Sequence, residues 1–308
     1  MSNPSSLRLG TRASPLARWQ ADYVAGELRR LGHEVELVLL STRGDEQRSA
    51  PLGVIGGQGV FTKELQRALL NNEIDLAVHS LKDLPTDVIE GLRLGAIPRR
   101  APTADALISR DGRLLAELPS GAAIGTGSLR RRAQLWHVRS DLRMLDVRGN
   151  VDTRLRKLAD REFDALILAH AGLLRLGLDR QITEILSDEI MLPAVGQGAL
   201  GIEIRSADAE LDLLLKPLDD AETRAAATAE RAMLAALRGG CLAPVGAKGE
   251  VTAGKLRLRG VVLSGDGSQR LAADQIGALA DATALGQRVA DDLLAQGAAA
   301  VIAATRTG

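Results

Sequence analysis

The sequence has a single cysteine, Cys241, among its 308 residues, so no disulfide bond can form within the chain. It has four histidines, and they do not stand at the spacings of zinc ligands, so we expect no metal site. No apolar run reaches the ~18 residues of a membrane-spanning helix, and we expect no association with a membrane. Because the segment Met1–Ser6 is short and polar, we also expect no signal peptide and a cytoplasmic location.

Aromatic residues make up only 2% of the sequence, too few for the stacking platforms that bind RNA or single-stranded DNA. The formal net charge is zero, so no general affinity for nucleic acid is indicated. The positive charge is carried by 33 arginines and 6 lysines. Arginine binds a carboxylate or phosphate through two hydrogen bonds of its planar guanidinium group. A GC-rich coding bias would give the same excess, so composition alone leaves both explanations open.

The length is typical of two or three domains, and the hydrophobic content of 45% is typical of a globular protein. Strands and helices are expected to alternate over the first two thirds, which predicts α/β units with mostly parallel sheets. The expected strands are Leu7–Gly10, Val35–Ser41, Ile74–His79, Leu92–Ile97, Ala122–Ile124, Arg143–Val147, Phe163–Ala169 and Gly201–Ile204. The expected helices begin at Pro15, capped by Ser14, and then cover Phe61–Leu70 with Thr62 as cap, Leu129–Val138 and Val151–Ala159.

The pattern changes in the last third. An alanine-rich helix is expected over Ala221–Leu237, followed by strands over Lys255–Ser264 and Gln269–Gln275 and a helix over Asp281–Leu294. This order predicts a small α+β module built on an antiparallel hairpin. Proline and glycine clusters mark two boundaries further upstream, at Pro98–Pro102 and Leu192–Gly198.

Hydroxyl groups and cations recur in the turns that follow the expected strands. Ligands of open α/β sheets bind beyond the carboxyl ends of the strands, where helix N-termini favour anions. The sequence therefore predicts a cleft for a ligand with several carboxylates or phosphates, although each turn alone could be an ordinary capped helix with a solvated face. The residues are Arg12, Ser14, Ser80, Lys82, Asp83, Thr126, Ser128, Arg130, Arg131, Arg148, Asn150, Arg154 and Arg175.

Two residues stand out within this pattern. Asp83 is a carboxylate among cations, and it could stabilise a developing positive charge or move protons. A turn aspartate paired with Lys82 or an arginine is the alternative. Cys241 follows the alanine-rich helix, whose negative C-terminal end disfavours a thiolate. It therefore suits permanent attachment of a group better than attack in every cycle, unless it is a small buried hydrophobic residue.

The chain resembles the porphobilinogen deaminase (hydroxymethylbilane synthase) family over essentially its whole length. The segments that carry the resemblance are Gly10–Ala17, Val78–Pro85, Gly125–Arg131, Arg148–Arg154, Leu192–Gly198 and Gly239–Cys241. The resemblance implies two doubly wound α/β domains, similar to type II periplasmic binding proteins, and a small α+β domain with an antiparallel sheet. Their expected ranges are 1–98 with 196–218 for domain 1, 99–195 for domain 2 and 219–308 for domain 3.

The resemblance also implies a transferase reaction. Four porphobilinogen molecules would be joined head to tail into hydroxymethylbilane, with release of ammonia at each step. A dipyrromethane cofactor, linked to Cys241 through a thioether, would prime the chain. The protein would act as a monomer in porphyrin and heme biosynthesis, and its product would pass to uroporphyrinogen III synthase.

Roles follow from the same resemblance, position by position. Asp83 would be catalytic, facing the pyrrole N–H groups. The residues expected to bind the cofactor are Cys241, Ser80, Lys82, Thr126, Ser128, Arg130, Arg131 and Arg154. The residues expected to bind the substrate or the growing chain are Arg12, Ser14, Phe61, Arg148 and Arg175.

Three other functions are compatible with parts of the pattern. A solute-binding protein could use the same two-domain cleft, but the expected lack of a signal peptide and the added cysteine-bearing module argue against it. A regulatory sensor would need a nucleic-acid-binding module, and no basic helix-turn-helix precedes the cleft. A transferase acting on a phosphate ligand would be expected to have a P-loop or a metal site, and neither is found.

Overall fold

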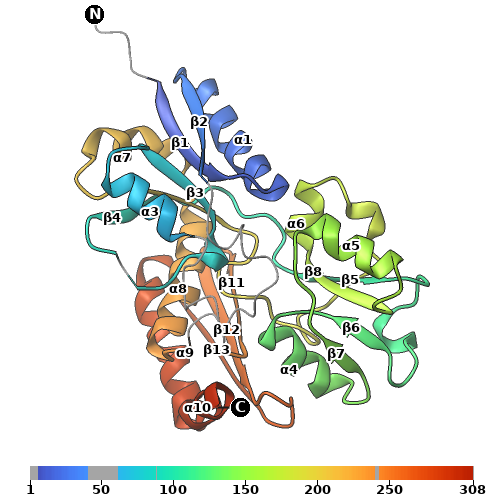
Figure 1. Cartoon of the computed structure of the whole chain (residues 1–308). Helices are drawn as coiled ribbons and strands as arrows, with labels where there is room; N and C mark the ends of the chain where they lie inside the picture. Colours follow the sequence, from blue (N-terminus) through green and yellow to red (C-terminus); the bar gives the residue numbers. More distant parts are fainter. Residues whose placement is uncertain (1–5, 41–61, 88, 240–242, 308) are drawn as a thin grey trace, which may run out of the picture. The chain divides into compact units, whose positions relative to one another are not determined.

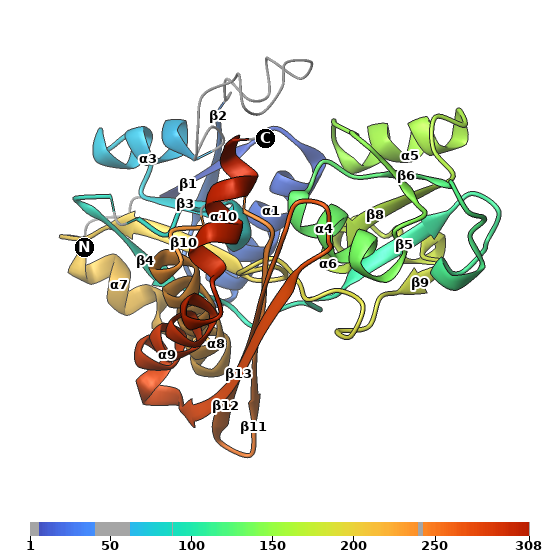
Figure 2. The ribbon, with the colours of Figure 1, turned by 90° about the horizontal axis from the view of Figure 1, so that it is seen from below.

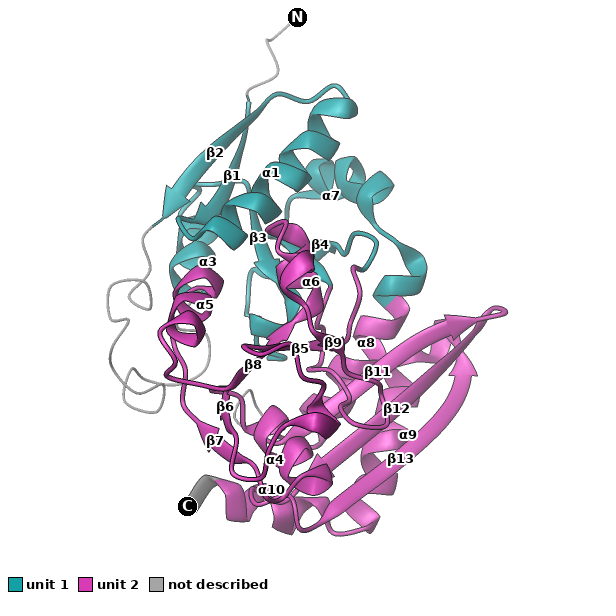
Figure 3. Cartoon of the chain, turned by 90° about the vertical axis from the view of Figure 1, so that its right-hand side faces the viewer, with its two compact units in different colours: residues 1–100, 199–224 teal, residues 101–198, 225–308 magenta. Residues whose placement is uncertain are grey.

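The computed structural model describes residues 6–40, 62–87, 89–239 and 243–307 (Figure 1). The chain divides into two compact units, which Figure 3 distinguishes by colour. Unit 1 consists of residues 1–100 and 199–224, and unit 2 of residues 101–198 and 225–308. The division into three domains with the ranges given above stays a prediction.

Unit 1 is built on a five-stranded sheet with the order β2-β1-β3-β10-β4. Its strands are β1 (Leu7–Arg12), β2 (Val35–Leu40), β3 (Leu76–Ser80), β4 (Leu92–Ala96) and β10 (Leu200–Arg205). β1 pairs in parallel with β2 and β3, whereas β10 is antiparallel to both of its neighbours. Helices α1 (Pro15–Arg30) and α7 (Ala209–Leu215) share one apolar cluster with this sheet, and α3 (Lys63–Leu70) belongs to a second cluster. Helices therefore pack on both faces of the sheet.

The start of α1 follows the sequence prediction. Ser14 has extended backbone angles, and its hydroxyl accepts a hydrogen bond from the Ala17 N–H at 3.3 Å, with Pro15 in the first turn. The predicted cap position of α3 is confirmed, since Thr62 is its N-cap residue, although the Thr62 side chain makes no capping hydrogen bond.

The first sheet of unit 2 has the order β7-β6-β8-β5-β9. Its strands are β5 (Asp105–Ser109), β6 (Ala123–Gly125), β7 (Arg143–Leu145), β8 (Ala165–Ala169) and β9 (Glu184–Ile185). β6 is parallel to β7 and β8, while β5 is antiparallel to β8. Leu135 of α4 (Leu129–Val138) lies in one apolar cluster, and residues of α5 (Val151–Ala159) and α6 (His170–Arg175) lie in another.

The second sheet of unit 2 has three antiparallel strands in the order β11-β12-β13. The strands are β11 (Val245–Thr252), β12 (Lys255–Leu263) and β13 (Arg270–Ala278), and the helices beside them are α8 (Ala221–Ala236), α9 (Ala282–Ala295) and α10 (Ala298–Thr307). These helices lie on one side of the sheet (Figure 2), and their apolar side chains form one core cluster with it. The predicted hairpin is confirmed, but it gains β11 as a third strand.

Short 3-10 turns complete the secondary structure of the described residues. They are Leu81–Asp83, Leu115–Glu117, Asp179–Gln181, Lys216–Leu218 and Leu279–Asp281. The predicted fold class is confirmed: the described residues form two five-stranded α/β sheets with flanking helices and a separate three-stranded antiparallel sheet with helices. Within the described part of the chain, no helix is long and apolar enough to cross a membrane.

The tip of the β12–β13 hairpin packs directly on α4. Gly267 has φ +74°, and a Cβ atom there would lie 2.5 Å from the carbonyl oxygen of Ala133. His137 Nδ1 lies 2.9 Å from the carbonyl oxygen of Gly267. Ala133 also shares an apolar cluster with Leu192 and with Val261 of β12. Within unit 2, α4 therefore packs against the C-terminal sheet.

Gly267→Ala is expected to destabilise the protein by about 2 kcal/mol or more, because it adds a clash with α4 to the strain of a left-handed alanine. Gly254→Ala is the matched control, since Gly254 has φ +71° and no atom within 4 Å of the added Cβ. It should cost only about 1 kcal/mol. Urea unfolding of both variants measures the difference, and equal losses would contradict the tight contact with α4.

Candidate functional site

The carboxyl end of β6 carries the first group of predicted ligand-binding residues. Thr126 is fully buried, and its hydroxyl accepts a hydrogen bond from the Ser128 N–H at 3.3 Å. The Thr126 N–H donates to the carbonyl oxygen of Leu145 on the neighbouring strand β7 at 2.9 Å. Ser128 is half-buried, precedes α4 and makes no capping hydrogen bond with its side chain. Its hydroxyl is therefore not engaged in holding the start of the helix.

Arg130 and Arg131, in the first turn of α4, both bind Asp105 at the start of β5. Arg130 Nη2 donates to Asp105 Oδ2 at 2.8 Å, and Arg131 donates to Oδ1 from Nε at 3.1 Å and from Nη2 at 2.7 Å. Asp105 is fully buried, and the two arginines are 4% and 7% exposed. We refer to these three residues as the Asp105 cluster.

The charges of the Asp105 cluster strongly affect one another. Burial by itself would raise the pKa of Asp105, but the positive charges of Arg130 and Arg131 and their hydrogen bonds hold it well below its usual value. Burial lowers the pKa of Arg130, and the positive charge of the neighbouring Arg131 lowers it further. The negative charge of Asp105 partly offsets this lowering. Two cations thus share one anion in a buried site, and the cluster retains one excess positive charge.

The outer ends of both guanidinium groups are held by backbone carbonyl oxygens. Arg130 Nη1 donates to Leu192 O at 2.7 Å, and Arg131 Nη1 donates to Ile167 O at 3.0 Å. The buried Nε of Arg130 has no hydrogen-bond partner among the described residues. Both arginines are expected from the family resemblance to bind the cofactor carboxylates, and that role stays a prediction.

The remaining predicted arginines of unit 2 follow β7 and β8. Arg154 Nε donates to the carbonyl oxygen of Gly149 at 2.8 Å, which ties α5 to the turn that precedes it. Arg175 Nη2 donates to the carbonyl oxygen of Gly198 at 2.7 Å. Arg148, Arg154 and Arg175 are all half-buried. Each therefore keeps part of its side chain accessible, and their roles as ligand contacts stay predictions.

In unit 1, the carboxyl end of β3 carries Ser80 and leads into the turn with Lys82 and Asp83. The Ser80 hydroxyl accepts a hydrogen bond from Gln20 Nε2 of α1 at 2.8 Å. Arg12 is the last residue of the neighbouring parallel strand β1, and Ser14 follows its carboxyl end. Within unit 1, the structure therefore brings these two groups of predicted residues to the same edge of the sheet.

Asp83 lies in an anchored turn. Leu81 and Leu84 on its two sides are buried, and the Leu81 N–H donates to the carbonyl oxygen of Ala199 at 3.0 Å. Asp83 itself is exposed. Within the described part of the chain, its carboxylate has no hydrogen bond or ion pair. The catalytic role of Asp83 stays a prediction.

A buried polar group supports β3 directly before this turn. His79 Nε2 lies 3.1 Å from Glu203 Oε2 of β10, and Gln66 Nε2 of α3 donates to Glu203 Oε1 at 3.0 Å. Neither this group nor Asp105 is among the residues predicted from the sequence. In both cases the available signal was a charged residue within a strand of otherwise buried residues.

Two predicted site residues, Cys241 and Phe61, lie outside the described residues. The chain before Cys241 differs from the expectation in one detail. Arg238, rather than Gly239, takes the left-handed conformation after α8, with φ +50°. A Cβ atom on Gly239 would lie 3.1 Å from Leu234 and 3.3 Å from Ala243, so this glycine is needed for close packing.

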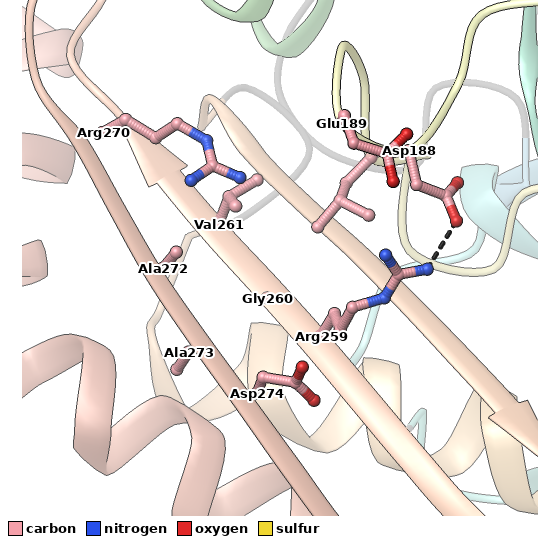
Figure 4. Close-up of a pocket in the computed structure, with 10 residues that line it drawn as sticks. Asp188, Glu189, Arg259, Gly260, Val261, Arg270, Ala272, Ala273 and Asp274 are labelled. Carbon is pink, nitrogen blue, oxygen red and sulfur yellow. Dashed lines mark hydrogen bonds and ion pairs between the residues drawn. The ribbon is translucent and has the colours of Figure 1, made fainter.

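A small pocket lies against β12 and β13 of the C-terminal sheet, with a volume of about 290 Å³ (Figure 4). Asp188 and Glu189 border it opposite Arg270 and Arg259, and Arg259 forms an ion pair with Asp188. None of the predicted site residues lines this pocket. No group of three or more potential metal ligands occurs in the part of the chain that the structure describes.

Solved structures with low similarity to the chain include solute-binding proteins. The periplasmic aliphatic sulphonate binding protein SsuA from Escherichia coli is 14% identical, with 77% of this chain and 71% of that chain covered and a TM-score of 0.41. A nutrient binding protein from Burkholderia cenocepacia, bound to methionine, is also 14% identical, with 68% and 90% covered and a TM-score of 0.42. Likeness at this level says nothing about activity.

Family models and relatives give a much stronger match. Residues 7–212 match the model "Porphobilinogen deaminase, dipyromethane cofactor binding domain", and residues 224–295 match "Porphobilinogen deaminase, C-terminal domain". Proteins named porphobilinogen deaminase from Pelotomaculum thermopropionicum and Syntrophotalea carbinolica are 49% and 47% identical to the chain. The matches cover 97% of this chain in both cases, and 97% and 96% of those proteins. The chain therefore belongs to the porphobilinogen deaminase family.

Proposed function

We propose that the chain joins four porphobilinogen molecules head to tail into hydroxymethylbilane. Each condensation forms one carbon–carbon bond and releases one ammonia, and one water supplies the hydroxyl group of the released product. The family match establishes a transferase of porphyrin and heme biosynthesis with porphobilinogen as substrate. The observation that carries the proposal in the structure is the Asp105 cluster, whose excess positive charge suits a substrate that bears carboxylates.

The residues of unit 2 fit a carboxylate-bearing cofactor. The family model that matches residues 7–212 is that of a dipyrromethane cofactor binding domain. Each pyrrole ring of such a group carries an acetate and a propionate. The buried Nε of Arg130 is unpartnered within the described residues, and the Ser128 side chain makes no capping hydrogen bond, so donors for anions remain. The residues that would hold the cofactor are Thr126, Ser128, Arg130, Arg131 and Arg154 from unit 2, Ser80 and Lys82 from unit 1, and Cys241.

When bound, the cofactor supplies the pyrrole carbon to which the first substrate unit is joined. Asp83 would stabilise the positive charge that develops on the pyrrole nitrogen of the reacting ring, and would move a proton during the condensation. Its exposure and its lack of an ion pair within the described residues support this role, because the carboxylate is available to a ligand. The anchored leucines on both sides of Asp83 would keep it in place.

Substrate and growing product are polyanions, since each added ring brings two more carboxylates. Arg12, Arg148 and Arg175 would bind these groups, together with Ser14 and Phe61. Ser14 and Arg175 also have structural hydrogen bonds, to Ala17 and Gly198. We therefore expect these two residues to contribute to the local backbone conformation as well as to the ligand.

The first test is the intact mass of the denatured protein before and after addition of porphobilinogen. The purified protein should carry an excess mass of two linked pyrrole units, and substrate should extend it in steps of one pyrrole unit. A mass that equals the sequence mass, and that neither substrate nor reconstitution changes, would contradict the proposed function.

The three-domain division, a monomeric state, a cytoplasmic location and transfer of the product to uroporphyrinogen III synthase belong to the same proposal. The boundary between the two matched family models, after residue 212 and before residue 224, supports a separate C-terminal domain. Size-exclusion chromatography with light scattering tests the monomer, and a dimer at micromolar concentration would contradict it.

A further inference from the structure

A single buried carboxylate determines how both arginines of the candidate cofactor site are oriented. Asp105 Oδ2 accepts a hydrogen bond from Arg130, and Oδ1 accepts two from Arg131. We propose that Asp105 is a positioning residue: it orients Arg130 and Arg131 and sets the cluster at one net positive charge, which one carboxylate of the ligand neutralises. This inference rests on the proposed function.

The geometry leaves the two guanidinium groups little freedom. Each is held by Asp105 on one edge and by a backbone carbonyl oxygen on another, at 2.7 Å from Leu192 and 3.0 Å from Ile167. An arginine side chain normally loses much rotamer freedom when it binds an anion. Here the side chains lose that freedom when the protein folds. Binding of a ligand carboxylate therefore does not carry this entropic cost.

The charge count distinguishes this cluster from a purely structural one. On the C-terminal sheet, Lys248 and Arg259 pair with Asp188 and Glu250, so that two cations balance two anions. The Asp105 cluster has two cations and one anion, although it is more deeply buried. An uncompensated buried charge is unfavourable unless something neutralises it. A ligand with a carboxylate would do so.

The same count indicates the class of ligand group. With Asp105 ionised, the cluster offers one positive charge, which matches a carboxylate better than a phosphate dianion. Without the charge of Asp105, the two arginines would offer two positive charges at the same place. Asp105 thus contributes to specificity as well as to orientation.

Gln197 connects this arrangement to the segment Leu192–Gly198. Its Nε2 donates to Asp105 Oδ1 at 3.0 Å and to the carbonyl oxygen of Thr103 at 2.8 Å. Gln197 is 1% exposed. The amide therefore binds the same carboxylate oxygen as Arg131, and substitution of Gln197 offers a second, milder way to disturb the position of Asp105.

The test compares cofactor loading in Asp105→Asn, in Asp141→Asn and in the unmodified protein. Full-length proteins prepared without cofactor are titrated with porphobilinogen at a temperature where circular dichroism shows each to be folded. Intact mass gives the loaded fraction. For Asp105→Asn, we expect the concentration for half-loading to rise about tenfold or more, because one carboxylate oxygen becomes an N–H donor and only one of the two arginines keeps its acceptor.

Asp141→Asn is the matched control. Asp141 pairs with Arg139 at the other end of α4, is exposed, and has its pKa lowered to about 2 by that arginine. Its substitution should leave half-loading unchanged. A role of Asp105 in folding alone would lower thermal stability without shifting the loading curve of the folded protein. Half-loading of folded Asp105→Asn at the concentration of the unmodified protein would therefore overturn the inference.

Gln197→Met covers the case in which Asp105→Asn does not fold. It keeps the side-chain volume and removes the hydrogen bonds of the Gln197 amide to Asp105 and to the carbonyl oxygens of Thr103 and Ala104. We expect a severalfold shift of half-loading in the same direction, and no shift would overturn the inference. Failure of the proposed function has a different signature, because the unmodified protein itself would then gain no mass.

Discussion

Asp83→Asn is expected to lower kcat by about 10²–10⁴-fold, the usual contribution of a positioned acid–base group. The carboxylate lies in an exposed turn without an ion pair among the described residues, so its removal breaks no structural interaction seen there. Asparagine keeps the shape but can neither carry negative charge nor accept the proton. We therefore expect an unchanged melting temperature and an intact mass that still includes the cofactor, together with very slow turnover.

Asp87→Asn provides the control for Asp83→Asn. Asp87 is an exposed aspartate four residues further along the chain, and its substitution should leave kcat and KM unchanged. Asp83→Glu separates the effect of the negative charge from that of its position, because it restores the charge on a longer side chain. We expect only partial recovery of kcat. Turnover of Asp83→Asn within a few-fold of the unmodified protein would exclude Asp83 as the charge-stabilising group.

Cys241→Ser is expected to abolish covalent attachment of the cofactor and, with it, product formation. The chain has no second cysteine that could form a thioether, so no other site can take over. The hydroxyl of serine is similar in size, and circular dichroism should show the same fold. Intact mass should equal the sequence mass, whereas the unmodified protein carries two additional pyrrole units.

Peptide mapping makes the assignment to Cys241 specific. Trypsin cleaves after Arg238 and after Lys248, so the cysteine lies on one ten-residue peptide, Gly239–Lys248. The added mass should be found on this peptide alone in the unmodified protein. Full activity of Cys241→Ser, or added mass on any other peptide, would show that the cofactor is anchored elsewhere.

Periodicity predicted most of the helices and strands because their apolar residues follow one face. The helix that begins at Pro15 and the hairpin around Gly265–Gly267 are examples, and both are confirmed. Strand β11 was not predicted, since Gly246, Lys248, Gly249 and Glu250 interrupt the apolar pattern. The structure explains both glycines: a Cβ atom on Gly246 would lie 2.9 Å from the carbonyl oxygen of Leu192, and one on Gly249 would lie 3.0 Å from the Ala226 backbone of α8.

The direction of strands depends on long-range pairing that a local pattern does not contain. Gly201–Ile204 was expected as a strand, but nothing in those residues shows that β10 runs antiparallel between β3 and β4. Similarly, the turns with Arg130 and Arg131 were predicted as part of the site. Their partner Asp105 was missed, because 25 residues separate Asp105 from Arg130 in the sequence.

The contact between Gly267 and α4 also limits how far the protein can be shortened. A chain that ended at residue 218 would retain the strands of both five-stranded sheets. It would lose Val261 and Leu263, which cover Ala133 and Leu192 next to the arginine-bearing turn. Part of the apolar side of α4 would then face water, so we expect residues 1–218 to be unstable when produced without the C-terminal sheet. In this chain, the C-terminal sheet therefore covers part of the apolar surface of α4, the helix that bears Arg130 and Arg131.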